Sequence, residues 1–192
     1  MDKFCVITNL DKDKDLETTT KIIEYIKQNN KECLFLDRKH SKESDCFFTD
    51  ADMIPDDTEC AIVLGGDGTI IQAAHDLAEK GIPILGINLG TLGFLAEIER
   101  HNLYDALELL FKDQCSIEER MMIKGTVKSN DTLVYSGFAL NDVVITRSGF
   151  SRIISFSVYV NNEFVDRYRG DGVIISTPTG STGYNLSSGG PI

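Results

Sequence analysis

The sequence lacks an apolar segment long enough to cross a membrane. No apolar run approaches the roughly 18 residues that a membrane-spanning helix needs. Met1-Asp2-Lys3 leads directly into a strand-like segment and not into a signal peptide. We therefore expect a cytoplasmic protein with no membrane partner.

Paired cysteines and clustered histidines are also missing. The five cysteines are odd in number, far apart and without a C-x-x-C pair, so neither a disulfide framework nor a zinc site is indicated. The three histidines show no metal-ligand spacing. We expect reduced thiols and no metal held by protein ligands alone; the residues concerned are Cys5, Cys33, Cys46, Cys60, Cys115, His40, His75 and His101.

Positive charge is scarce. The chain has 19 Lys and Arg against 30 Asp and Glu, which gives a formal net charge of -11. Non-specific nucleic-acid binding needs clustered cations, so this balance argues against a nucleic-acid partner. A ligand rich in phosphate would need local positive charge, a metal ion or backbone dipoles.

The first part of the chain alternates strand-like and helix-like segments, which is typical of an α/β layer. We expect a Rossmann-like three-layer α/β domain over residues 1–115, with residues 39–57 as a polar surface loop. The expected strands are 4–8, 33–36, 61–64 and 82–88, and the expected helices are 14–30, 69–80 and 102–112.

From residue 116 onward the pattern changes to period-two alternation with many β-branched and aromatic residues. We expect a second, mainly β domain, β-sandwich-like, over residues 116–192. Its strands are predicted at 122–129, 133–147 and 153–169, with a hairpin turn at Asn161-Asn162. The sequence stops just after a glycine- and serine-rich segment, so we expect a chain truncated at its C-terminus.

The sequence Gly65-Gly66-Asp67-Gly68-Thr69 stands where an apolar strand turns into a helix. Glycines let a backbone approach a ligand closely, and a helix start favours an anion. Asp67 would repel phosphate unless it binds a cation or accepts a proton, which indicates phosphoryl chemistry. A glycine-rich turn without a ligand would look similar, and this one fits neither the P-loop nor the dinucleotide fingerprint.

Two further segments carry polar groups beside apolar strands. The adjacent Asn141 and Asp142 interrupt an apolar run, so they must be hydrogen-bonded, face solvent or bind something. Residues 168–185 combine Asp171, hydroxyls, glycines and Tyr184, a mixture that can hold phosphate, ribose and a stacked base.

Taken in order, these segments resemble the NAD kinase family. The resemblance covers the Gly-Gly-Asp-Gly-Thr motif at 65–69, a second glycine loop at 85–95, the pair Asn141-Asp142 and the Asp-Gly to Ser-Thr-Pro-Thr-Gly-Ser-Thr segment at 171–182. It implies an α/β domain, a β-rich domain and NAD bound in the cleft between them. It also implies transfer of the ATP γ-phosphoryl group, or one from polyphosphate, to the 2′-hydroxyl of the adenosine ribose, with Mg²⁺ or another divalent cation.

The resemblance assigns roles to individual residues. Asp67 would be the catalytic proton acceptor, and the phosphate contacts would be Gly66, Gly68 and Thr69. The NAD-binding residues would be Asn141, Asp142, Arg169, Asp171, Thr182, Gly183, Tyr184 and Ser187. Gly183 stands where most family members have alanine, which should loosen or enlarge that part of the pocket.

Three readings stay open beside it. A lipid or sugar kinase shares the Gly-Gly-Asp-Gly turn, and a non-catalytic dinucleotide-binding protein could share the whole set of motifs. A lipid kinase would need a basic or apolar membrane-facing patch, which the net charge of -11 opposes.

The resemblance also implies a homo-oligomer, a dimer or tetramer.

Overall fold

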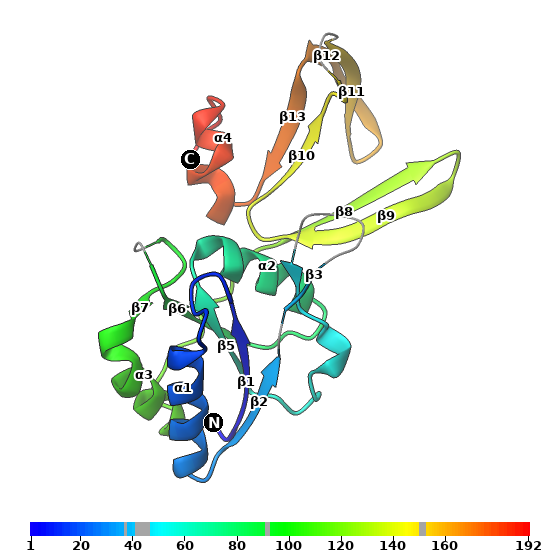
Figure 1. The fold of residues 1–192 in the computed structure, drawn as a ribbon. Helices are drawn as coiled ribbons and strands as arrows, with labels where there is room; N and C mark the ends of the chain where they lie inside the picture. The colour runs from blue at the N-terminus through cyan, green and yellow to red at the C-terminus, as the bar shows by residue number, and fades with distance from the viewer. Residues whose placement is uncertain (37, 41–46, 91–92, 150–152) are drawn as a thin grey trace. The chain divides into compact units, whose positions relative to one another are not determined.

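The chain forms two compact units, Met1–Glu119 and Arg120–Ile192 (Figure 1). The computed structural model describes residues 1–36, 38–40, 47–90, 93–149 and 153–192. The expected boundary after Cys115 lies within the polar stretch that follows the last helix of unit 1. No helix in the described ranges is long and apolar enough to cross a membrane.

Unit 1 is built on a five-stranded sheet in the order β2-β1-β5-β6-β7. Every neighbouring pair is parallel. The central strands read as continuous apolar runs because both of their faces are covered. The strands are β1 Lys3–Thr8, β2 Glu32–Leu36, β5 Cys60–Gly65, β6 Ile84–Asn88 and β7 Ile98–Glu99.

Three helices cover the two faces of this sheet (Figure 1). Helices α1 Glu17–Gln28 and α3 Leu103–Phe111 pack on one face, where Ile22, Ile26 and Leu107 are fully buried. Helix α2 Asp67–Leu77 packs on the other face through Ile70, Ala73 and Leu77. The expected three-layer α/β architecture is confirmed.

The segment 39–57 was expected to be a surface loop, and this prediction was wrong in part. It contains β3 Lys39–His40 paired with β4 Phe47–Phe48, then the short 3-10 helix η1 Ala51–Met53. The Thr49 N–H donates to the Asp76 carboxylate of α2 at 2.6 Å, and Ile54 is buried in the core. These two anchors fix a polar segment that composition alone marks as a loop. Residues 41–46, including Cys46, lie outside the described residues.

Unit 2 is mainly β, as expected, and its described strands pair two by two. The pairs are β8 Ile123–Ser129 with β9 Thr132–Ala139, β10 Asp142–Thr146 with β13 Gly172–Ser176, and β11 Ile154–Val160 with β12 Glu163–Gly170. No stack of two larger sheets forms among these described strands. The positive φ angles of Asn161 and Asn162, 52° and 67°, confirm the hairpin turn. The 3-10 helix η3 Thr179–Thr182 and the short helix α4 Tyr184–Ser187 follow.

The predicted strand 133–147 is broken in the structure. Strand β9 ends at Ala139, and β10 begins at Asp142. The Asn141 carbonyl accepts hydrogen bonds from the Thr177 N–H at 2.9 Å and the Thr177 hydroxyl at 3.1 Å. This contact with a distant segment ends one strand pairing and starts another, so Asn141 lies at a break and not inside a strand.

Leu107 and Leu109 of helix α3 offer a matched test of this core. Leu107 is fully buried, whereas Leu109 on the same helix is 48% exposed. We expect Leu107→Ala to lower the free energy of unfolding of unit 1 by about 2–5 kcal/mol, since it removes buried methyl groups and leaves a cavity. Leu109→Ala should change it by less than about 1 kcal/mol. Urea unfolding followed by helical circular dichroism measures both, and equal losses would contradict the layer assignment.

Candidate functional site

The carboxyl ends of β1, β5 and β6 form the edge of the sheet where a ligand is expected. The chain first adds β2 on one side of β1 and then β5, β6 and β7 on the other. The loops after β1 and β5 therefore diverge at this point, which in open parallel sheets is the usual position of a binding crevice. The Asn9 side-chain amide donates to the Thr69 hydroxyl at 3.2 Å and ties the two loops together.

The Gly65–Thr69 turn links β5 to α2 tightly. Gly66 has an extended backbone and precedes the helix, which begins at Asp67. A Cβ on Gly65 would collide with the side chain of Thr69, so a larger residue there would force the turn open. Thr69 is buried and Gly68 is exposed. The turn thus exposes backbone at Gly68 while Thr69 anchors it.

The Asp67 carboxylate points back across the turn to a second loop. It accepts backbone N–H bonds from Phe94 at 2.7 Å, Leu95 at 3.0 Å and Ala96 at 3.2 Å. A Cβ on Gly93 would overlap the carboxylate, so the glycine makes this close approach possible. Asp67 therefore fixes the position of the second glycine-containing loop relative to the first. Thr91 and Leu92 of the predicted loop lie outside the described residues.

These contacts also set the charge of Asp67. Burial opposes ionisation of the carboxylate, but the three backbone N–H groups and the positive charge of Lys12 outweigh it. The pKa of Asp67 is therefore lowered from its ordinary value of 3.8. At neutral pH the edge of the sheet carries an ionised carboxylate in a fixed orientation.

A cavity of about 400 Å³ lies beside this edge, at the ends of β6 and β7. Its lining includes Asn88, whose side-chain oxygen accepts the Gly90 N–H at 2.8 Å. Arg100 and His101 also line it, and sequence reasoning missed both because neither lies in a recognisable motif. The Nδ1 atom of His101 is 3.3 Å from the Oε2 atom of the Glu99 carboxylate.

In unit 2, Asn141 carries an unsatisfied polar atom. Its side-chain oxygen is buried and has no hydrogen-bond partner among the described residues. A Cβ on Gly180 would collide with the Asn141 backbone, so the 177–180 turn presses directly against this position. Buried acceptors without partners are uncommon and call for an explanation, and a ligand donor is one.

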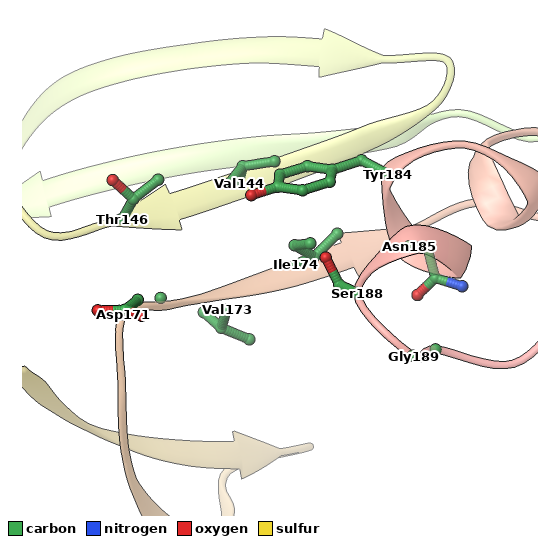
Figure 2. Close-up of a pocket in the computed structure, with 11 residues that line it drawn as sticks. Val144, Thr146, Asp171, Val173, Ile174, Tyr184, Asn185, Ser188 and Gly189 are labelled. Carbon is green, nitrogen blue, oxygen red and sulfur yellow. The ribbon is translucent and has the colours of Figure 1, made fainter.

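A groove of about 540 Å³ lies between β10, β13 and the C-terminal segment. Figure 2 shows the Tyr184 ring alongside Val144, with Thr146 and Asp171 toward the other end. The Asp171 carboxylate is 3.0 Å from the Arg147 guanidinium, a partner that the sequence did not suggest. The groove combines an exposed aromatic ring with hydroxyl, amide and carboxylate groups.

The structure brings only some of the sequence-predicted residues of unit 2 to this groove. Asp171 and Tyr184 line it, together with Asn185 of the predicted segment 168–185. Val144, Thr146 and Ser188 also line it, and sequence reasoning missed these three. Asp142 begins β10 opposite Ser176. Arg169 lies on the β11–β12 hairpin opposite Ser155 and is exposed. The other predicted residues, Thr182, Gly183 and Ser187, are exposed in or beside η3 and α4.

The titration of Asp67 tests the hydrogen-bonded geometry directly. We expect its side-chain carboxyl carbon, followed by NMR, to titrate with a midpoint below 3.8. Because the folded pKa is lowered, the ionised group stabilises the fold above pH 3.8, and this contribution is lost as pH falls through the folded pKa. The Asp67→Asn spectrum identifies the resonance by its loss. A midpoint at or above 3.8 would show that the three N–H bonds do not hold the carboxylate.

Comparison with known sequences places these features in one family. The ATP-NAD kinase N-terminal domain matches residues 4–115, and the ATP-NAD kinase C-terminal domain matches residues 140–192. An NAD kinase of Lachnoclostridium phytofermentans is 58% identical over all of this chain, which covers 67% of that relative. An NAD kinase of Agathobacter rectalis is 46% identical over all of this chain, which covers 66% of it. The chain thus spans about two thirds of the length of the curated relatives that it matches.

Solved structures agree. An NAD kinase from Archaeoglobus fulgidus in complex with ATP has a TM-score of 0.70 and 26% identity, over 98% of this chain and 66% of that one. A yeast NADH kinase complexed with NADH shares the fold, with a TM-score of 0.72 and 22% identity over 100% of this chain and 62% of that one. With both domain matches in chain order and close relatives across its whole length, this chain belongs to the ATP-NAD kinase family.

Proposed function

We propose that this chain catalyses transfer of the ATP γ-phosphoryl group to the 2′-hydroxyl of the adenosine ribose of NAD, which yields NADP. Membership of the ATP-NAD kinase family supports this assignment. The observation that carries it furthest is Asp67, an ionised carboxylate fixed at the carboxyl edge of a parallel sheet between two glycine-containing loops.

Asp67 acts as the acceptor for the proton of the attacking hydroxyl. A low pKa makes the carboxylate a weak base, but phosphoryl transfer passes through a loose transition state in which alignment and charge stabilisation matter most. The 2′-oxygen of NAD forms a bond to the terminal phosphorus of ATP as the bond between that phosphorus and the bridging oxygen breaks. ADP leaves with the bridging oxygen, and the hydroxyl proton passes to Asp67. The three N–H bonds orient the carboxylate before the substrate arrives.

Unit 2 supplies the dinucleotide contacts in this proposal. The unpartnered side-chain oxygen of Asn141 accepts a hydrogen bond from the adenosine part of NAD, and Asp142 holds the ribose. The exposed Tyr184 ring offers a face for stacking, and Asp171 faces the nicotinamide end. Arg169, Thr182, Gly183 and Ser187 complete the NAD contacts, and Gly66, Gly68 and Thr69 contact phosphate.

The donor brings its own divalent cation. No group of three or more His, Cys, Asp and Glu side chains suited to a metal occurs in the described parts of the chain. We assign Mg²⁺ to the phosphates of the donor, as part of the substrate, because Mg²⁺ in phosphoryl-transfer sites is bound through substrate phosphates and water with only one or two carboxylates. The working protein is a cytoplasmic homo-oligomer in this proposal.

The three alternatives differ in the substrate that they turn over. A lipid or sugar kinase shares the Gly-Gly-Asp-Gly turn, whereas a dinucleotide-binding protein without catalysis would bind NAD and not turn it over. A coupled assay with ATP, Mg²⁺ and NAD, and with diacylglycerol and fructose 6-phosphate as acceptor controls, distinguishes them. Product from either control acceptor but none from NAD would overturn the proposed function.

Removing the Asp67 carboxylate should stop the reaction. We expect Asp67→Ala to lower kcat for NADP formation by about a hundred- to ten-thousand-fold, as for loss of an acid or base group. NAD affinity, measured by calorimetry, should stay within about threefold, because the proposed adenosine contacts belong to unit 2. Asp52→Asn, an exposed carboxylate on η1, is the control for the charge change. Normal turnover by Asp67→Ala would exclude the proposed role.

Replacing Asn141 should weaken NAD binding without lowering the stability of the fold. Its side-chain oxygen is buried without a partner, so Asn141→Ala should leave the free energy of unfolding unchanged or raise it by about 1 kcal/mol. The same change should weaken NAD binding about tenfold, since the ligand loses an acceptor. Thr126→Ala, at an exposed position of β8, serves as the control for both measurements. A stability loss with unchanged NAD affinity would make Asn141 a structural residue only.

A further inference from the structure

Lys12 occupies the topological switch point of unit 1, and neither the motifs nor the proposed residue roles include it. It lies in the loop after β1, next to the Gly65–Thr69 turn that follows β5. Its ammonium nitrogen is 2.7 Å from the point where a Cβ on Gly66 would stand. The same nitrogen is 3.4 Å from the corresponding point on Gly90, at the end of β6. The ammonium therefore lies above the glycines of two neighbouring loops.

The loop that carries Lys12 is held at several points. The Asn9 N–H donates to the Leu64 carbonyl at 2.9 Å, and the Lys12 N–H donates to the Asn9 carbonyl at 3.0 Å. Asn9 also bonds Thr69. The Asp13 carboxylate accepts the Thr18 and Thr19 N–H groups at the start of α1. These bonds place the Lys12 backbone firmly at the edge of the sheet.

The ammonium itself has no hydrogen-bond or ion-pair partner within the described residues, and the side chain is exposed. Its charge nevertheless acts on the site, because it contributes to the lowered pKa of Asp67. In a chain of net charge -11, a phosphate chain is repelled unless a cation stands where it binds. Lys12 provides such a cation beside the proposed catalytic carboxylate of Asp67, next to the backbone of Gly66 and Gly90.

We propose that Lys12 binds the terminal phosphoryl group of a linear phosphate donor, the chemistry shared by a nucleoside triphosphate and inorganic polyphosphate. The ammonium neutralises charge on the terminal phosphate oxygens and keeps that group near Asp67 despite the repulsion between the two anions. Gly66 and Gly90 leave the space around the ammonium open. This inference rests on the proposed kinase function, since it assigns a phosphate contact in the same site.

Calorimetry with two probes, ATP and inorganic tripolyphosphate, each with Mg²⁺, tests the inference on the full 192-residue chain. We expect Lys12→Ala to raise the Kd for both probes by about tenfold or more, because a charge-assisted contact to phosphate is lost. Lys12→Arg should restore affinity to within about threefold. Lys14→Ala, an exposed lysine of the same loop, makes the same charge change and should alter Kd by less than about twofold.

The pattern of Kd changes shows what Lys12 contacts. A loss confined to ATP assigns the contact to nucleotide donors, and a loss for both probes assigns it to phosphate itself. Equal losses in Lys12→Ala and Lys14→Ala would show a general charge effect, and failure of Lys12→Arg to restore binding would show a structural role; either overturns the inference, as does the absence of binding to the unchanged chain. NADP formation is read separately, so Lys12-dependent binding without NADP would reject the proposed function alone.

Discussion

The hydrogen bonds from the backbone of Phe94, Leu95 and Ala96 to the Asp67 carboxylate are the interaction on which the candidate site depends. They join the turn after β5 to the loop after β6, and they hold an ionised group at the edge of the sheet. The two loops are also joined by the Leu89 N–H bond to the Gly65 carbonyl and by Leu95 and Ala96, which pack in the same core cluster as Ile70 of α2. With the bonds to Asp67, one side chain both shapes the edge and supplies its negative charge.

The sheet order explains why these loops matter. Because β1 is flanked by β2 on one side and β5 on the other, the loops after β1 and β5 separate at the carboxyl edge. The Asn9 side chain of the loop after β1 bonds Thr69, which follows β5, and the Lys12 ammonium lies close to Gly66 and Gly90. A cation, an anion and open backbone thus stand together at the place where α/β sheets bind phosphorylated ligands.

Sequence patterns predicted much of this arrangement but not the contacts that hold it. Apolar runs and period-two alternation located the strands, and the glycines around Asp67 marked the turn. The backbone N–H groups that bind Asp67, however, come 27–29 residues later in the chain, and no local sequence pattern predicts them. Lys12 sits among alternating Asp and Lys, which looks like a solvated charged loop. Asn141 was placed inside a strand because its contact with Thr177 is made by the backbone, which leaves no trace in the sequence.

Amide hydrogen exchange at Phe94, Leu95 and Ala96 is the measurement that tests this account most directly. The three N–H groups donate to one carboxylate, so in the unchanged chain their hydrogens should exchange more slowly than those of loop amides without a hydrogen bond. In Asp67→Ala they should exchange at least about tenfold faster, while the core amides of β5 keep their rates. Equal exchange at these three amides in both proteins would contradict the claim that Asp67 assembles the site.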